Sequence, residues 1–113
     1  MSKFDEKVAQ YEKFMTTKGL KFDADLLKAV TKGLGPSIYK RDAETVSGSD
    51  PKELATVKKN FLIKKLGLSD DPKLDEAIAS VIEKIGKSER SKYRAVVYYL
   101  LAVHFGKESI YNK

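Results

Sequence analysis

Residues 71–86 read DPKLDEAIASVIEKIG, and they decide the fold. Asp71 and Pro72 are typical of a helix start, because the carboxylate accepts hydrogen bonds from free backbone amides and proline fits the first helical position. The apolar residues that follow recur at steps of three and four and so share one helix face: Leu74, Ala77, Ile78, Val81, Ile82 and Ile85. Gly86 is typical of a helix end. The stretch therefore predicts an amphipathic helix with one face in a core.

The segment after this helix is more apolar still. Ser88 is a good capping residue, and from Ala95 to Val103 the chain is apolar on nearly every side of a helix. We therefore expect a last helix that begins at Ser88 and ends before Gly106. A helix without a polar face belongs in the interior of a bundle, so the other helices are expected to pack around this one.

Earlier helices are predicted from the same two signals, a capping residue and a helical repeat of apolar side chains. The first covers residues 4–18, the second residues 23–33 and the third residues 50–67. A weaker signal at Pro36–Arg41 predicts a short additional helix. No stretch alternates apolar and polar residues for long enough to predict a strand. The sequence thus predicts an all-α fold, a single compact bundle of five to six helices around an apolar C-terminal helix, which spans residues 1–113.

Length and composition agree with one soluble domain. The chain has 113 residues, a common domain size, and 42% of them are hydrophobic. It contains no cysteine, which excludes disulfides and thiolate metal sites and favours a reducing compartment. Residues 1–7 lack the apolar run of a signal peptide, and the apolar run at Ala95–Val103 is far shorter than the span of about 20 residues that a membrane helix needs. We expect a cytoplasmic protein that does not bind a membrane.

Few residues offer catalytic chemistry. His104 is the only histidine, so catalytic dyads and multi-histidine metal sites lack a second member, and we expect it to pack at a helix end. Gly86-Lys87-Ser88 resembles the end of a phosphate-binding loop, but Val81 stands where the first glycine is needed and a predicted helix precedes the motif. The densest carboxylate cluster is explained by a helix start, where negative charge is favourable: Asp70, Asp71, Asp75 and Glu76. We therefore predict no catalytic residue, no cofactor and no metal, and a protein that is not an enzyme.

Basic residues support a second interpretation. The chain has a net charge of +6, with most of the excess in its C-terminal half. Basic side chains crowd the connector before the last helix and its first turns: Lys87, Arg90, Lys92 and Arg94. Two helices joined by a short turn with glycine also resemble a helix-turn-helix, which presents its second helix to a DNA groove. Because Glu83 and Glu89 interrupt the positive charge, nucleic-acid binding through these basic side chains is the alternative prediction.

The segment Arg41–Asp50 is polar, contains glycine and is the part of the chain that helix packing explains least. Such a loop is a favoured place for a protein-binding surface. Tyr39, Arg41 and Asp42 are the candidate contacts, since arginine and tyrosine are enriched in interface hot spots. A structural interpretation stands beside this one, in which Asp42 caps a turn, Arg41 pairs with an acid on the surface and Tyr39 belongs to the core.

Several short stretches resemble a known family: Arg41-Asp42, Val46-Ser47, Ser49–Leu54, Asn60-Phe61, Lys64–Leu68, Tyr98–Leu101 and Phe105–Lys107. It is the small bacterial domain-of-unknown-function family twenty-eight fifty-three. The resemblance implies a bacterial cytoplasmic protein that stands alone as one domain, and it implies no activity, ligand or catalytic residue. Together these observations predict a non-enzymatic interaction or structural module whose expected partner is another protein, without indicating its oligomeric state.

Overall fold

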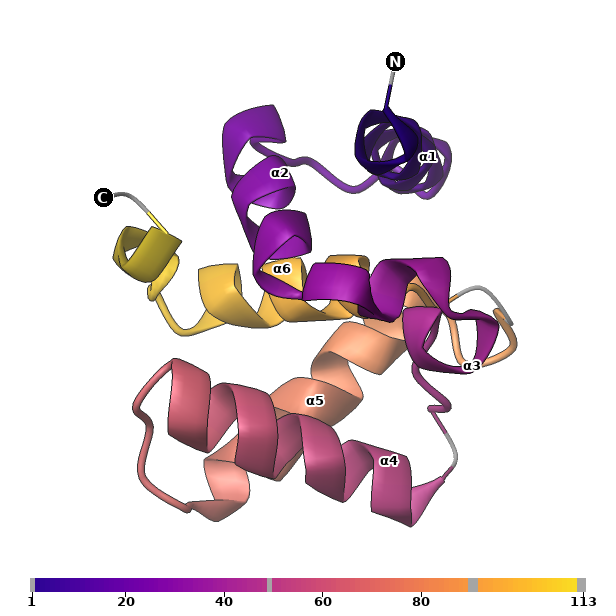
Figure 1. Ribbon diagram of the computed structural model, residues 1–113. Coiled ribbons are helices and arrows are strands. Elements are labelled where there is room, and N and C mark those ends of the chain that lie inside the picture. Colours follow the sequence, from indigo (N-terminus) through magenta and orange to yellow (C-terminus); the bar gives the residue numbers. More distant parts are fainter. Residues whose placement is uncertain (1, 49, 90–91, 112–113) are drawn as a thin grey trace.

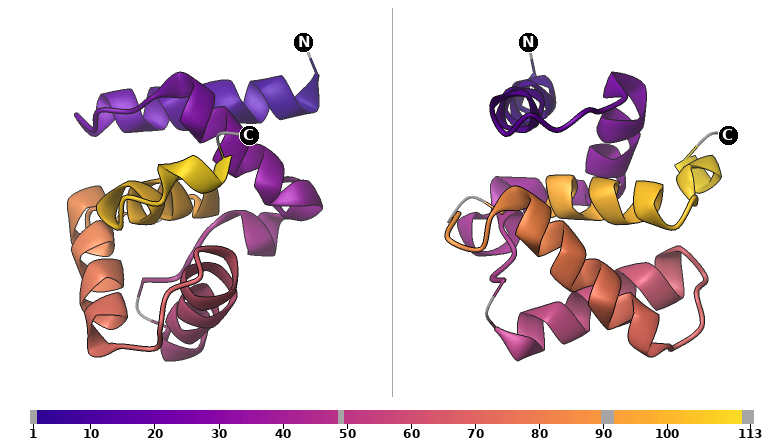
Figure 2. Two further views of the ribbon diagram at one scale, coloured as in Figure 1. Left: turned by 90° about the vertical axis from the view of Figure 1, so that its left-hand side faces the viewer. Right: turned by 180° about the vertical axis from the view of Figure 1, so that it is seen from behind.

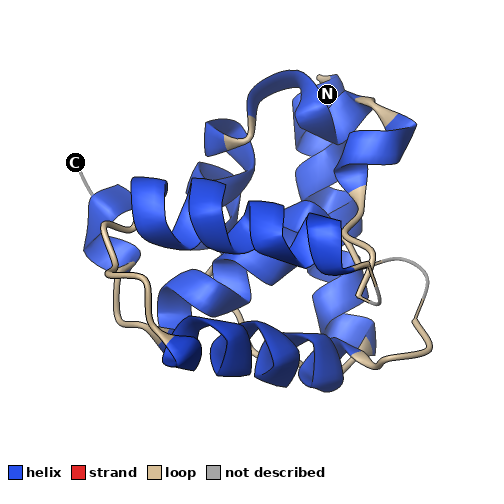
Figure 3. Ribbon diagram, turned by 90° about the horizontal axis from the view of Figure 1, so that it is seen from below, coloured by secondary structure: helices blue, strands red, loops and turns tan. Residues whose placement is uncertain are grey.

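The computed structural model describes residues 2–48, 50–89 and 92–111, apart from the side chains of Arg41 and Asp42. The regular elements in this part of the chain are helices, and one isolated antiparallel bridge joins Thr45 to Tyr93 (Figures 1 and 3). The elements are α1 (Lys3–Thr17), α2 (Ala24–Gly33), η1 (Gly35–Tyr39), α3 (Arg41–Glu44), α4 (Pro51–Thr56), η2 (Val57–Lys65), α5 (Pro72–Ile85), α6 (Arg94–His104) and η3 (Glu108–Tyr111). The all-α prediction is confirmed. The predicted short helix near Pro36 is the 3₁₀-helix η1.

Helix α6 lies in the middle of the molecule, with α1 and α2 on one side and α4 and α5 on the other (Figures 1 and 2). It packs against α1, α2, α3 and α5. An unbroken run of its residues is buried: Ala95, Val96, Val97, Tyr98, Tyr99, Leu100, Leu101 and Ala102. The prediction that the other helices surround the last one is therefore confirmed. The radius of gyration is 13.0 Å, close to the value of about 13 Å for a compact chain of this length.

The predicted start of α6 is wrong. The helix begins at Arg94, not at Ser88. The described residues between Gly86 and Tyr93 are not helical, and the Lys92 carbonyl accepts a hydrogen bond of 2.8 Å from the amide of Val46 in a distant segment. This hydrogen bond and the antiparallel bridge between Thr45 and Tyr93 take the place of hydrogen bonds within a helix. The short turn that a helix-turn-helix requires is therefore not present between α5 and α6.

Asp23, Asp50 and Asp71 cap α2, α4 and α5 as the sequence predicts. The carboxylate of Asp50 accepts a hydrogen bond of 3.0 Å from the amide of Lys52, and Asp71 accepts one of 2.8 Å from the amide of Lys73. The apolar face predicted for residues 72–85 is buried in full. Local chemistry is sufficient at these starts, because an N-cap needs only the amides two or three residues further along.

The predicted helix at residues 50–67 has two parts. Helix α4 passes directly into η2, a π-helix with its last hydrogen bond of 2.9 Å from the Leu66 amide to the Phe61 carbonyl. In a regular α-helix, Val57 and Leu66 would be about two and a half turns apart and would face opposite sides. Both are buried, so the wider turn brings Val57 and Leu66 to the same face.

His104 lies in the last turn of α6, at a helix end as predicted, but its side chain is exposed. The prediction that it packs is therefore wrong, because only an edge-on ring contact with Phe105 is formed, at 4.9 Å between ring centroids. Within the described residues, no helix combines the length and the apolar character that crossing a bilayer requires.

Candidate binding cleft

Tyr39 is the exposed member of the predicted protein-binding group. Its side chain lies at the end of η1 and is 47% exposed, so the interpretation that it belongs to the core is wrong. The backbone of Arg41 and Asp42 forms the first turn of α3, but their side chains lie outside the described part of the structure. Helix α3 leads directly to Thr45, where the chain enters the wall of a cleft.

The predicted nucleic-acid-binding residues do not form one exposed group. Lys87 is exposed, and Arg90 lies outside the described residues. Lys92 is only 5% exposed and donates from Nζ to two backbone carbonyls, that of Lys87 at 2.9 Å and that of Glu89. The guanidinium of Arg94 is also held inside the protein, as described below. Arg94 has partners more than 40 residues away in the sequence, and Lys92 turns back onto its own loop, so neither interaction is visible in the pattern of basic residues that assigned both to one surface.

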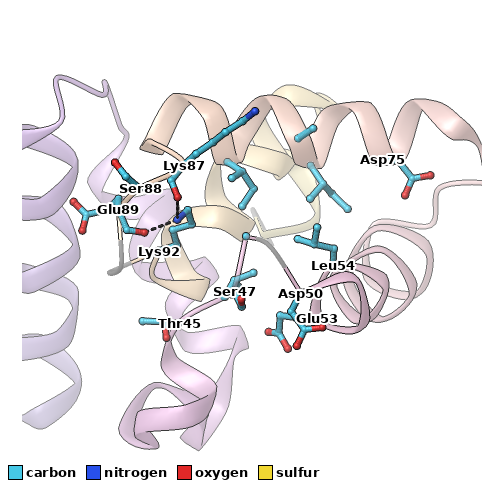
Figure 4. Close-up of a pocket in the computed structure, with 15 residues that line it drawn as sticks. Thr45, Ser47, Asp50, Glu53, Leu54, Asp75, Lys87, Ser88, Glu89 and Lys92 are labelled. Atoms are coloured by element: carbon cyan, nitrogen blue, oxygen red, sulfur yellow. Dashed lines mark hydrogen bonds between the residues drawn. The ribbon is translucent and has the colours of Figure 1, made fainter.

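A cleft with a volume of about 900 Å³ opens beside α5. Helix α5 forms one wall, the segment from Thr45 to α4 forms the other, and the loop after α5 closes one end (Figure 4). Its lining is Thr45, Val46, Ser47, Gly48, Asp50, Glu53, Leu54, Asp75, Ile78, Ala79, Ile82, Lys87, Ser88, Glu89 and Lys92. Of the predicted site residues, Lys87 and Lys92 line this cleft. They lie close to residues 45–48 and to α4, a proximity that the sequence analysis did not predict.

The walls meet at Gly48. A Cβ atom at this position would lie 3.0 Å from Ile82 Cγ2 and 3.1 Å from Lys92 Cε, closer than ordinary van der Waals contact. Glycine therefore allows the segment 45–48 to approach both α5 and the loop 86–92. The hydrogen bond from the Val46 amide to the Lys92 carbonyl fixes the same approach.

The Lys92 ammonium holds the end of the cleft together. Its bonds to the carbonyls of Lys87 and Glu89 close the loop around the charged group (Figure 4). The Glu89 side chain also forms an ion pair of 2.8 Å with Lys18, which connects the loop to the end of α1. Partly buried polar contacts of Lys92 and Glu89 therefore hold this end of the cleft.

Arg94 fixes the opposite wall. Its guanidinium donates to the Ala43 carbonyl at 2.8 Å and to the Tyr98 hydroxyl at 3.1 Å, and it is ion-paired with Glu53. Burial lowers the pKa of Arg94, but the hydrogen bonds with Tyr98 and Glu53 outweigh this effect and raise the pKa above its usual value. Glu53 lies in the first turn of α4, and its ion pair with Arg94 joins α4 to α6.

The acidic cluster at the start of α5 forms ion pairs with a lysine. Lys58 on η2 is 3.0 Å from an Asp70 carboxylate oxygen and 3.1 Å from one of Asp75. Its hydrogen bonds with Asp70 and Asp75 raise the pKa of Lys58. Asp71 is the N-cap of α5, as predicted from the sequence. Two of the predicted helix-start acids therefore also attach η2 to α5, and one of them, Asp75, lies at the far end of the cleft (Figure 4).

A family model described as a protein of unknown function, DUF2853, matches residues 10–109. The chain belongs to this family. The sequence resemblance to DUF2853 is thereby confirmed, and the match also includes α2 and most of α1, which the resembling stretches did not cover. Several residues in those stretches line the cleft: Val46, Ser47, Asp50, Glu53 and Leu54. No curated protein matches this DUF2853 chain.

Proposed function

We propose that this protein is a cytoplasmic, non-enzymatic interaction module that binds another protein through the cleft. The observation that carries the proposal is the form of the cleft. Its floor is apolar and buried, with Val46, Ile78 and Ile82 each at most 5% exposed. Its rim is exposed and polar: Ser47, Asp50, Asp75, Lys87 and Ser88. An apolar centre with a polar rim is the usual composition of a protein interface.

The chemistry of the lining supports binding over catalysis. Its hydroxyl groups, on Thr45, Ser47 and Ser88, would need a base to become nucleophiles, and His104 is not among the lining residues. The carboxylates of Glu53 and Asp75 are engaged in ion pairs with Arg94 and Lys58. These side chains therefore have structural partners rather than the arrangement of an acid and a base around a substrate. The absence of cysteine supports the cytoplasmic assignment.

Nucleic-acid binding is the alternative, and the structure gives it less support. Phosphate binding requires several accessible cations, because affinity comes from the number of phosphates neutralised. Lys92 and Arg94 donate to groups within the protein, which leaves Lys87 as the exposed cation among the described members of the predicted group. A protein partner is therefore the better-supported proposal.

Site-specific photo-crosslinking in cells tests the proposal. A photoreactive amino acid in place of Ala79, an exposed residue of the cleft, is expected to capture a defined protein, and treatment with nuclease should not change the product. The matched control carries the same group in place of Val103, which is 42% exposed and lies outside the cleft. The same products from both positions, no product, or a product that nuclease removes would contradict the proposal, and the last of these would favour nucleic acid.

A further inference from the structure

Three of the six charged side chains that line the cleft have partners of opposite charge. Glu53 pairs with Arg94, Asp75 with Lys58 and Glu89 with Lys18. These pairs leave Asp50 and Lys87, both exposed and neither in an ion pair within the described residues. The charges that the cleft offers to a ligand are therefore one carboxylate and one ammonium on its rim.

Lys92 adds to the positive end. A lysine ammonium has three donors, and among the described residues two of them are used, for the carbonyls of Lys87 and Glu89. The remaining donor belongs to a cation that is 5% exposed and lines the cleft beside Lys87. Because a buried charge is poorly screened by water, an anionic group placed here would interact more strongly than one at an exposed lysine.

The two free charges lie in different parts of the cleft, Lys87 in the loop at one end and Asp50 at the start of the wall opposite α5. In Figure 4, Lys87, Ser88 and Lys92 come from the loop end, with the Lys87 side chain extending along α5, whereas Asp50 lies beside Glu53 at the start of α4. The apolar floor lies between α4 and α5 and includes Ile78 and Ile82. A ligand that fills the cleft therefore meets a positive end, an apolar floor and a negative wall.

The length of the cleft limits what fits. From Asp75 to Ile82, its wall on α5 extends for about 10 Å, given a rise of about 1.5 Å for each helical residue. This distance corresponds to about three residues of extended chain or about two turns of helix. The cleft thus matches a short segment of a protein rather than a large folded surface.

We infer that the cleft recognises a short peptide segment of its protein partner in which an acidic and a basic residue flank apolar side chains. The acidic residue binds at Lys87 and Lys92, and the basic residue binds at Asp50. The inference rests on the proposed function, and it adds the chemistry and the orientation of the partner segment.

A random peptide library displayed on phage provides the probe, with the full-length protein as bait. Peptides that bind in the cleft should compete with each other for the protein. They should not bind to the Ala79→Trp variant, in which the indole fills the space between the walls. The expected consensus contains apolar residues between one acidic and one basic position. Enriched cleft-binding peptides without this charge pattern would overturn the inference.

Charge exchange then tests the orientation. Lys87→Glu is expected to weaken a selected peptide by about tenfold or more, and replacing the acidic residue of that peptide with lysine should restore the affinity. Asp50→Asn removes the negative charge but keeps a capping side chain, so it should weaken the same peptide without loss of the helix start. Lys13→Glu, an equal change of charge on the exposed side of α1, is the control and should leave affinity unchanged.

The outcomes separate the two proposals. Selected peptides that bind equally well to Lys87→Glu and to the unchanged protein overturn the inference, while a crosslink from position 79 still supports the interaction module. A crosslinked partner together with no enriched peptide also overturns the inference, because the partner is then recognised through a folded surface. If no crosslink forms and no peptide is enriched, both proposals are overturned.

Discussion

Gly48 lies where the two walls of the cleft are in close contact, so there is too little space for a side-chain methyl group. Gly48→Ala would place Cβ 3.0 Å from Ile82 and 3.1 Å from Lys92, so we expect it to lower the free energy of unfolding by about 1–3 kcal/mol, the usual effect of overpacking. Denaturation in urea measures the change. Ser47→Ala, at the exposed neighbouring position, should change stability by less than about 0.5 kcal/mol. Equal stabilities of the two variants would contradict the packing described at Gly48.

Lys92 gives a second prediction at this scale. Lys92→Met keeps most of the buried aliphatic chain but leaves the carbonyls of Lys87 and Glu89 without their donor. Loss of a donor to a buried group costs about 1–3 kcal/mol, so we expect a reduction in the free energy of unfolding of that size. Lys87→Met is the control, since its ammonium is exposed. If both variants melt at the same temperature, Lys92 is not the structural lysine that its contacts indicate.

Single residues show which parts of the site could be predicted from the sequence. Asp50 and Asp71 were assigned correctly as caps because each bonds to an amide two residues away. Arg94 was assigned to a basic surface because its partner, the carbonyl of Ala43, lies elsewhere in the chain, and Lys92 was assigned there because the fold of its own loop, which buries its ammonium, has no local sequence signal. Sequence neighbours determine a cap, whereas the availability of a charge depends on tertiary contacts.

Among the elements, α4 depends on a long-range ion pair as well as on its cap. Arg94 joins α6 to α4 through Glu53 and to α3 through Ala43, and its side chain is 12% exposed. Arg94→Met should therefore destabilise the protein by about 3–5 kcal/mol, because it leaves Glu53 without its cation in a partly buried position. A double-mutant cycle with Glu53→Gln measures the coupling directly. Additive effects of the two changes would show that the pair does not connect these helices.

The short helix η3 should respond to alkaline pH. Burial, followed by the charge of Tyr98, raises the pKa of Tyr111 on η3 from 10.0 to about 12. The folded protein therefore holds the phenol proton more tightly than the unfolded chain, and this stabilisation is complete below pH 10 and is lost as the pH rises to about 12. Unfolding measured across this pH range should lose stability less steeply in Tyr111→Phe than in the unchanged protein. Identical slopes would contradict the burial of this phenol.

The boundaries of the helices show where local sequence patterns fail to predict the structure. The periodicity of residues 72–85 identified the buried face of α5 completely, because one helix face packs on one core. The start of α6 was placed too early, because Ser88 satisfies the local rule for a cap while Lys92 and Tyr93 pair with Val46 and Thr45 instead. The π-helical turns of η2 were also not predicted, since the need to bury both Val57 and Leu66 arises from packing.

For the whole molecule, α6 is the common support of both halves. Leu101 is fully buried in α6, so Leu101→Ala should lower the free energy of unfolding by about 2–5 kcal/mol. Because α2 and α5 both pack on α6, hydrogen exchange should accelerate in both helices to a similar extent. Val103→Ala, at an exposed position of the same helix, is the matched control. Faster exchange confined to one side would show that the halves are stabilised independently.

The central place of α6 also has a consequence for synthesis on the ribosome. Translation proceeds from the N-terminus, so α1 to α5 emerge before the helix that covers their apolar faces. Until residues 94–104 have left the exit tunnel, those helices have their local caps and turns but lack the shared surface on which they pack. The nascent chain is thus expected to stay unfolded or loosely collapsed until α6 has emerged and then to acquire its tertiary structure in a nearly single event.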